Sequence, residues 1–414
     1  MLDQFERFDM QKDPTRQKLR WLTYLLSKPK VKKRNTKIIY DDKIESYKGP
    51  LLLLGNHNAF SDMEVLNMVG HHLKLRMNYV VAIDGFINRE KLLRTIGGIC
   101  KRKFTQDKYL VKQLKKVVNR GDTAVIYPEA RYSLCGTTAI VPKSLAKLVK
   151  FLGAPVATLL CHGHHINTPF WNLDDRHIPY TEALCSLALT KEEVEELSVD
   201  QIYERIISNL TYNDYEWQRD NNIRLPYEKR AEGLEKVLYQ CPHCGKEYEM
   251  TSEGNHLFCK ACGKKWILNN NGTLAALEGE TEFELPPDWY EWERENVKKE
   301  VLEGKYRFED TVDVDFLPNA KGYQNLGKGH FVHDENGFHL KGNYEGEDYE
   351  IIIPAKEAYS VHIEYDYLGC GRDLVDINTL NETMYLYPNK DKFAVTKISL
   401  ATEEIYKKLW NKNE

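Results

Sequence analysis

The segment Leu51-Leu52-Leu53-Leu54-Gly55-Asn56-His57-Asn58-Ala59-Phe60-Ser61-Asp62 decides the fold class of this 414-residue chain. Four consecutive leucines between Pro50 and Gly55 predict a buried strand of a parallel sheet. The run from Ser61 to Glu64 has the pattern of a capping box, which predicts that a helix begins at Asp62. His57 is therefore expected in the turn from the strand to the helix.

The spacing of His57 and Asp62 predicts that the two side chains meet. Asp62 would occupy the first helical position, where the positive end of the helix favours an ionised carboxylate that reaches back to the imidazole. A histidine oriented in this way is suited to remove a proton, which indicates an enzyme. The competing interpretation is a turn histidine beside a helix cap, because a histidine and an aspartate five positions apart also occur by chance.

A second stretch, Tyr127-Pro128-Glu129-Ala130-Arg131-Tyr132-Ser133, follows the histidine motif at a distance. With His57 and Asp62, it resembles the glycerolipid acyltransferases typified by 1-acylglycerol-3-phosphate acyltransferase, over residues 15 to about 210. The resemblance implies that His57 is a general base on an acceptor hydroxyl, which attacks an acyl thioester, and that Asp62 fixes the histidine. It also implies acyl-CoA or acyl carrier protein as donor, a lysophospholipid-type acceptor and no catalytic cofactor.

The resemblance also implies residues that bind the acceptor, although the motifs depart from the family here. The run from Gly97 to Lys103 corresponds to a block that helps to hold the acceptor's phosphate, with Lys103 in place of arginine and Arg102 beside it. Lysine lacks the planar fork that grips phosphate, so an acceptor other than lysophosphatidate stays open, as does a solvated basic loop. Glu129 is implied to bind the acceptor or to organise its loop. Arg131, displaced by one place, is implied to meet phosphate or to pair with Glu129.

Strand and helix patterns alternate through the first part of the chain, residues 1 to 235. The expected strands after Leu54 are 78–83, 123–127 and 155–160, and the expected helices are 63–68, 107–119 and 142–152. This alternation predicts an α/β domain with a largely parallel sheet flanked by helices. His57 and Glu129 would both lie at the carboxyl ends of strands, where active groups of such sheets gather. His162, His164 and His165 follow the last strand, and alternation would point His164 and His165 to opposite sides, so we expect packing or loop histidines.

Four cysteines in two pairs predict a metal site between residues 236 and 270. Cys241 and Cys244 form one Cys-x-x-Cys pair, Cys259 and Cys262 form the other, and each pair is followed by Gly-Lys. This spacing is typical of a zinc ribbon with one structural zinc, although an iron centre uses similar spacing. Four thiolates leave no open coordination position, so the metal is not expected to take part in catalysis.

The last part, residues 271 to 414, has the pattern of a β-rich domain. A helix near 288–302 is followed by eight candidate strands, 311–316, 329–333, 338–341, 349–353, 359–365, 373–377, 383–387 and 392–398, and by a helix at 402–411. Seven or eight short strands closed by one helix resemble a pleckstrin-homology-like or GRAM-like barrel. Such a module binds lipid headgroups or a protein partner, and the pattern does not choose between them.

The region from Gln17 to Arg34 pairs apolar residues at helical spacing with a basic run. Its helix is expected to end near Pro29. Tryptophan and leucine flanked by lysine and arginine are typical of a helix that lies on an anionic membrane surface. The alternative is an ordinary amphipathic helix whose apolar stripe packs on the core.

Composition narrows the class of protein. The net charge is −4 and nine cysteines are present. Four cysteines lie in Cys-x-x-Cys pairs and five are scattered, which fits a reducing compartment better than a disulfide framework. No signal peptide is expected and no apolar run reaches ~20 residues, so we expect a cytoplasmic, peripheral membrane protein. Acidic residues among the lysines of the ribbon argue against nucleic acid. The sequence therefore predicts an acyltransferase, and the alternative is a zinc-ribbon adaptor or lipid-binding protein with a weakened acyltransferase-like domain.

Overall fold

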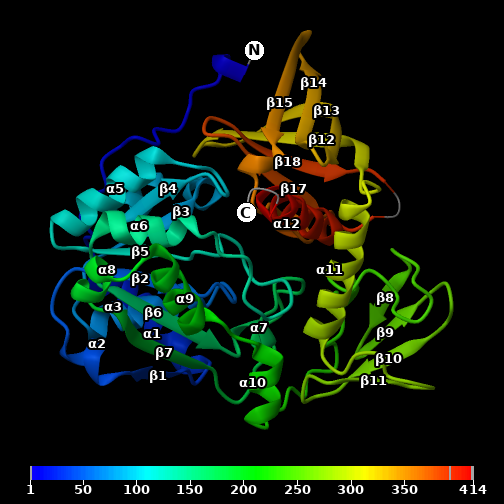
Figure 1. Cartoon of the computed structure of the whole chain (residues 1–414), viewed down its shortest axis with the longest axis horizontal. Coiled ribbons are helices and arrows are strands. Elements are labelled where there is room, and N and C mark those ends of the chain that lie inside the picture. Colours follow the sequence, from blue (N-terminus) through cyan, green and yellow to red (C-terminus); the bar gives the residue numbers. More distant parts are fainter. Residues whose placement is uncertain (1, 391–392, 412–414) are drawn as a thin grey trace.

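The computed structural model describes residues 2–390 and 393–411 of the chain and contains three sheets (Figure 1). The first sheet has the strand order β1-β7-β6-β2-β5-β3-β4. Neighbouring strands are parallel, except that β6 and β7 are antiparallel. The largely parallel sheet predicted from the sequence is therefore confirmed. Its strands are β1 (Lys37–Tyr40), β2 (Leu52–Gly55), β3 (Met77–Ala82), β4 (Gly98–Lys101), β5 (Thr123–Ile126), β6 (Val156–His162) and β7 (Glu182–Leu189).

Helices cover both faces of this sheet. Leu52 and Leu54 of β2 belong to an apolar cluster with α5 (Lys108–Asn119), α6 (Ser144–Leu152) and α9 (Val199–Leu210). Leu51 and Leu53 point to the other face, where they join a cluster with α1 (Arg20–Lys33), α2 (Asp42–Ser46) and α3 (Asp62–His72). Because side chains alternate along a strand, an unbroken leucine run supplies both cores. Shorter helices complete this part: α4 (Glu90–Thr95), α7 (His164–Asn167), α8 (Lys191–Glu196) and α10 (Asp214–Asp220).

The second sheet carries the cysteine pairs. Its four antiparallel strands are β8 (Met250–Glu253), β9 (His256–Cys259), β10 (Lys265–Leu268) and β11 (Leu274–Ala276). The long helix α11 (Pro286–Leu302) runs beside it in Figure 1. Trp266 of β10 packs edge-on against Trp289 of α11, with ring centroids 5.0 Å apart. The sheet thus buries its apolar side against the rest of the molecule.

The third sheet is antiparallel and has the strand order β15-β14-β13-β12-β18-β17-β16. Its strands are β12 (Phe308–Asn319), β13 (Gly322–Asp334), β14 (Gly337–Tyr344), β15 (Glu347–Pro354), β16 (His362–Glu364), β17 (Leu374–Asn378) and β18 (Thr383–Pro388). The helix α12 (Val395–Asn411) follows them. A β-rich region closed by a helix is confirmed, and its likeness to a pleckstrin-homology or GRAM domain stays a prediction.

The predicted strand at 392–398 is wrong over its described residues: 393–394 are irregular, and α12 begins at Val395; Lys392 lies outside the described residues. Val395, Ile398 and Ile405 are buried at helical spacing. The β-branched residues that suggested a strand therefore form the buried face of a helix, because packing overrides local propensity.

Apolar contacts join the three sheets. The largest hydrophobic cluster contains residues of the first part, of the ribbon and of the C-terminal sheet, among them Phe170, Trp266 and Phe331. Near the N-terminus, Phe5 packs on Phe316, and the amide of Phe8 donates to the carbonyl of Pro318 at 2.9 Å. The boundaries proposed at 235 and 270 remain predictions.

Helix α1 continues four residues beyond Pro29, so its predicted end is wrong. Pro29 cannot donate to the carbonyl of Leu25, but Leu25 is exposed and its carbonyl can bond water. Among the helices that the structure describes, none has the length and apolar character needed to span a bilayer.

Candidate active site

His57 lies in the turn between β2 and α3, at the carboxyl end of a central strand. Its Nδ1 lies 3.2 Å from Oδ2 of Asp62. The side chain of Asp62 is 1% exposed and that of His57 is 21% exposed. Since Nδ1 faces the carboxylate, Nε2 is the ring nitrogen directed away from Asp62.

Helix α3 begins at Asp62 as predicted, but the predicted capping box from Ser61 to Glu64 is not formed. Ser61 makes no capping hydrogen bond from its side chain. Instead, Oδ2 of Asp62 accepts the backbone amides of Asn58 at 2.7 Å and Ala59 at 3.0 Å. The carboxylate therefore closes the turn that carries His57 as well as contacting its ring.

Asp62 is ionised despite its burial. Burial raises its pKa, but hydrogen bonds from His164 and then from His57 outweigh that effect and hold the pKa below its usual range. A buried negative charge beside an imidazole is the arrangement that a general-base histidine requires.

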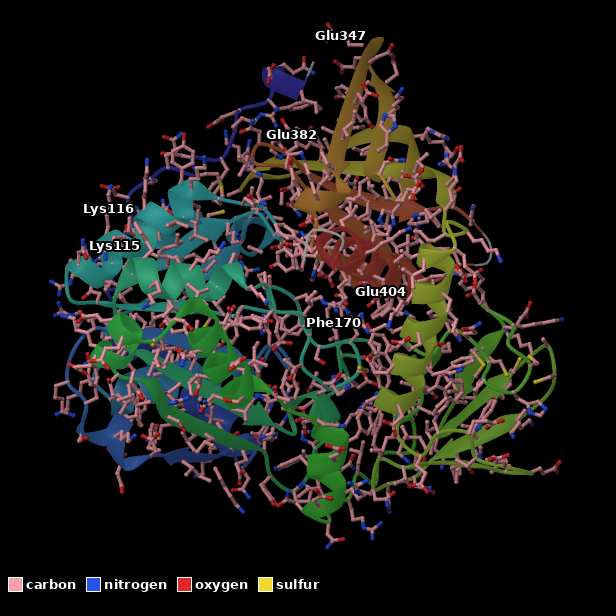
Figure 2. All side chains as sticks on the ribbon, in the orientation of Figure 1. Lys115, Lys116, Phe170, Glu347, Glu382 and Glu404 are labelled. Carbon is pink, nitrogen blue, oxygen red and sulfur yellow. The ribbon has the colours of Figure 1, made fainter. Side chains whose placement is uncertain are left out.

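Aromatic rings flank the imidazole of His57. Tyr127 stacks on it with centroids 4.3 Å apart, and Tyr132 lies tilted against it at 4.1 Å. Phe60 and Phe170 pack on Tyr132. Phe170 also contacts His362 and Tyr365 of the C-terminal sheet, and Figure 2 shows it between the first part and α12. The rings of Tyr127 and Tyr132 restrict the orientation of the imidazole and place aromatic surface beside it.

Glu129 ties the loop after β5 to the His57 turn. Its Oε1 accepts the backbone amide of His57 at 3.0 Å, and its Oε2 accepts that of Ala139 at 2.7 Å. The amide of Ser133 in turn donates to the carbonyl of His57 at 2.8 Å. Burial raises the pKa of Glu129 to about 7, although these two amide donors favour the ionised form. The two loops are thus joined around the histidine by one carboxylate.

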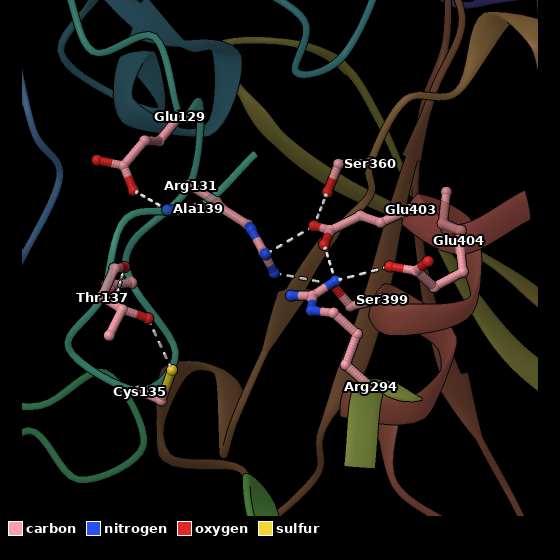
Figure 3. A network of polar contacts seen from close by, with 12 residues as sticks. Glu129, Arg131, Cys135, Thr137, Ala139, Arg294, Ser360, Ser399, Glu403 and Glu404 are labelled. Atoms are coloured by element: carbon pink, nitrogen blue, oxygen red, sulfur yellow. Dashed lines mark hydrogen bonds and ion pairs between the residues drawn. The ribbon is translucent and has the colours of Figure 1, made fainter. Parts of the chain in front are cut away.

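Arg131 points toward Ser399 and Glu403 of α12 (Figure 3). Its guanidinium donates to Oγ of Ser399 at 2.8 Å and to Glu403 at 2.7 Å, and both charged side chains are at most 4% exposed. Arg294 of α11 binds the other oxygen of Glu403 at 2.6 Å. Arg131 therefore pairs with Glu403 of α12 and not with Glu129.

Lys103 and Arg102 also face the C-terminal sheet. Nζ of Lys103 lies 3.0 Å from carboxylate oxygens of both Asp84 and Asp376. Arg102 is 2% exposed and donates to the carbonyl of Leu380 at 3.1 Å. The solvated basic loop considered for this run is not observed, and the phosphate role stays a prediction.

The sequence reading missed His164, which lies beside Asp62. Its Nδ1 lies 2.6 Å from Oδ1 of Asp62, and its side chain is fully buried. The strand pattern does not continue through this region because Gly163 has φ 80° and α7 begins at His164. The alternation of a strand therefore does not apply to His164 and His165; both are buried, and they contact different groups, His164 Asp62 and His165 the rings of Trp171 and Tyr215. His162, by contrast, is part-exposed and stacks on Trp217.

Asn58 and Asp214 are further residues of the site that the sequence reading did not single out. The side chain of Asn58 donates to the carbonyl of Cys161 and to Oδ2 of Asp214, both at 2.9 Å. The amide of Gly163 donates to the same oxygen of Asp214 at 3.0 Å. These bonds fix the turn after β2 to the end of β6, and no sequence signal connects residues so far apart.

Asp62, Cys161 and His164 lie close enough to share a metal ion. Burial raises the pKa of the Cys161 thiol well above its usual range, so the sulfur stays protonated and is a poor ligand. Both oxygens of Asp62 already accept hydrogen bonds. The chemistry of this group fits a hydrogen-bonded site and not a metal site.

The four paired cysteines do form a group suited to a metal. Their sulfurs lie within 4.8 Å of one another. Sγ of Cys241 is 3.8 Å from that of Cys262, and Sγ of Cys244 is 3.8 Å from that of Cys259. Thiolates at ~2.3 Å from a tetrahedral zinc ion are about 3.8 Å apart, so the spacing fits that ion.

Comparisons with known proteins identify no family. No protein-family model and no curated protein matches the chain. Among solved structures, the 1-acyl-sn-glycerophosphate (LPA) acyltransferase PlsC from Thermotoga maritima is similar over 46% of this chain and 80% of its own, with 12% identity and a TM-score of 0.33. A likeness of this size leaves the function to be argued from the site itself.

Proposed function

We propose that the protein transfers a fatty acyl group from a thioester to a hydroxyl of a lysophospholipid-type acceptor, with His57 as general base. The observation that carries this proposal is the buried, ionised Asp62 beside a part-exposed His57 at the carboxyl end of β2. The motifs that resemble glycerolipid acyltransferases agree with it.

The chemistry needs no nucleophile from the protein. Nε2 of His57 takes the proton of the acceptor hydroxyl as its oxygen forms a bond to the thioester carbonyl carbon. Asp62 stabilises the resulting imidazolium. The tetrahedral intermediate then collapses, the carbon–sulfur bond breaks, and the imidazolium returns the proton to the leaving thiolate. The products are an ester and a free thiol.

The donor in this proposal is acyl-CoA or acyl carrier protein, and the acceptor-binding residues are Arg102, Lys103, Glu129 and Arg131. In the structure, Lys103 forms an ion pair with Asp376, and Arg131 forms one with Glu403. An acceptor phosphate reaches these two cations only where it displaces the carboxylates. The aromatic surface around His57 suits the apolar part of a lipid.

Helix α1 supports a membrane surface as the place of action. Its side chains Thr23, Ser27 and Val31 are buried, whereas Trp21, Leu25 and Leu26 are 60%, 54% and 64% exposed. The apolar stripe therefore faces outward, and the exposed basic side chains of Lys30 and Lys33 follow it. Both features favour binding to an anionic membrane: the exposed apolar side chains can be buried in it, and the basic side chains are attracted to its charge.

The second candidate is an adaptor or lipid-binding protein whose acyltransferase-like part is weakened. The observation that favours it is the commitment of Lys103 and Arg131 to buried ion pairs with the C-terminal part. In this alternative, a pleckstrin-homology-like C-terminal domain would bind a lipid headgroup or a protein partner.

An assay of thiol release separates the two candidates. Purified full-length protein is incubated with acyl-CoA or acyl carrier protein and a panel of lyso-acceptors with and without phosphate. Acceptor-dependent thiol release, with formation of the matching ester, supports the acyltransferase. Binding of acceptor without turnover for every donor and acceptor favours the adaptor.

A further inference from the structure

Asp62 bridges two histidines. Its Oδ2 faces Nδ1 of His57 at 3.2 Å, and its Oδ1 faces Nδ1 of His164 at 2.6 Å. His164 begins α7 directly after β6, whereas His57 lies in the turn after β2. The two imidazoles thus approach one carboxylate from different strands of the sheet.

The contact with His164 is the shorter of the two and the more deeply buried. His164 is 0% exposed, and Nε2 of its ring has no hydrogen-bond partner within residues 2–390 and 393–411. Asp62 is therefore the group that holds this ring by a hydrogen bond. Because an ionised carboxylate only accepts, Nδ1 of His164 must carry the proton and donate it.

Hydrogen bonds to its two oxygens set the orientation of the Asp62 carboxylate. The backbone amides of Asn58 and Ala59 bind Oδ2, the oxygen that also faces His57. Oδ1 is bound by His164. A donor on each oxygen prevents the carboxylate from rotating about its Cβ–Cγ bond, so Oδ2 stays directed at His57.

We propose that His164 is a positioning residue for the acyl transfer proposed above: by donating from Nδ1 to Oδ1 of Asp62, it fixes the carboxylate that orients and stabilises His57. His164 does not touch the substrate. The inference rests on the proposed function, because it gives His164 a role in the reaction for which His57 is the base.

The test compares three substitutions of His164. Asparagine places an amide nitrogen where Nδ1 stands, glutamine moves that nitrogen one bond farther, and leucine removes the donor while keeping a side chain of moderate size. We expect His164→Asn to keep kcat within ~3-fold of the wild type, and His164→Gln and His164→Leu to lower it ~10- to 100-fold with little change in KM.

The Gln variant keeps the test decisive if the Leu variant fails to fold, because glutamine is polar and matches asparagine in chemistry. Equal kcat values for His164→Asn and His164→Gln would overturn the inference, as would a loss that appears in KM and not in kcat. The proposed function fails separately, when the wild type shows no acceptor-dependent transfer or when His57→Ala leaves transfer unchanged.

Discussion

At the scale of single residues, the contacts of Glu129 match one of the two roles that the motif implied, the organisation of its loop. The carboxylate holds the amides of His57 and Ala139, and the neighbouring Ala130 has a φ of 55°. Glycine adopts this left-handed conformation without penalty, so alanine costs about 1 kcal/mol here. The loop keeps its shape because Glu129 and the amide of Ser133 bind it to the His57 turn.

We predict that Glu129 makes the protein less stable as pH rises through neutrality. Burial raises its folded-state pKa from 4.5 to about 7, so folding favours the protonated form. This contribution is fully present below pH ~4.5 and is lost as pH rises to ~7, by about 3 kcal/mol. In Glu129→Gln, this part of the pH dependence should vanish. Urea unfolding of both proteins between pH 5 and pH 8 measures it, and parallel curves would contradict the prediction.

At the scale of secondary-structure elements, α1 shows how one pattern allows two structures. Its apolar stripe is compatible with core packing or with a membrane surface. The structure turns the stripe outward and packs the helix on the rest of the protein through small polar residues and Val31. Trp21 is therefore exposed, and its replacement is not expected to unfold the chain.

We predict that Trp21→Glu weakens binding to anionic vesicles without lowering the melting temperature. Glutamate places a like charge on the surface that would meet anionic lipid, and it removes a large apolar contact. Cosedimentation with vesicles of phosphatidylcholine, with or without phosphatidylserine, measures binding, and salt should weaken it because charges are screened beyond ~8 Å. Phe151→Glu is the control, since Phe151 is 51% exposed on α6 over the opposite face of the sheet.

Equal loss of vesicle binding in both variants would contradict a specific role for α1. If only Trp21→Glu unfolded, the Trp21 face of α1 would belong to the core of the folded protein, and the proposed membrane role of α1 would be contradicted.

Most strands of the first sheet could be predicted because their signals are local. The leucine run before His57 and the apolar segments at β3, β5 and β6 are long enough to identify buried strands, and the Asp62 contact follows from a spacing of five residues. The position of His164 could not be predicted, because the reversal at Gly163 depends on a backbone angle. The Arg131–Glu403 pair joins residues 272 positions apart, and no local pattern indicates such a contact.

At the scale of the whole molecule, a buried ion pair joins the C-terminal helix α12 to the loop that follows β5. Glu403 is 1% exposed and binds Arg131, Arg294 and Ser360 (Figure 3). The two arginines hold its pKa at about 2 against the effect of burial. The pairing of these charges therefore joins the first part of the chain, α11 and α12.

We predict that Glu403→Gln destabilises the protein by about 3 to 5 kcal/mol, because two buried guanidinium groups lose their shared counter-charge. Glu404→Gln, one position along α12, is the matched control. Glu404 contacts Arg294 at a longer distance, 3.4 Å, so a smaller loss is expected. Denaturant unfolding gives both values, and equal losses would refute the assigned role of Glu403.

Metal content provides a further prediction for the whole molecule. The purified protein should contain one zinc ion bound by Cys241, Cys244, Cys259 and Cys262. Because Cys241 and Cys259 belong to the largest apolar cluster, removal of the metal by a strong chelator should lower the melting temperature of the entire chain. Elemental analysis and calorimetry test this, and a protein without stoichiometric metal, or with a coloured iron centre, would contradict it. Cys241→Ser should affect stability more than catalysis.

The central claim is that His57 acts as a general base supported by Asp62. The most direct measurement is kcat for ester formation, by mass spectrometry of the product, in wild type, His57→Ala and Asp62→Asn. Loss of a general base lowers kcat by ~10²- to 10⁴-fold, so folded His57→Ala with bound zinc should show that loss. Asp62→Asn should also lose activity, because an amide does not stabilise the imidazolium. Turnover by folded His57→Ala within a few-fold of the wild type would contradict the account.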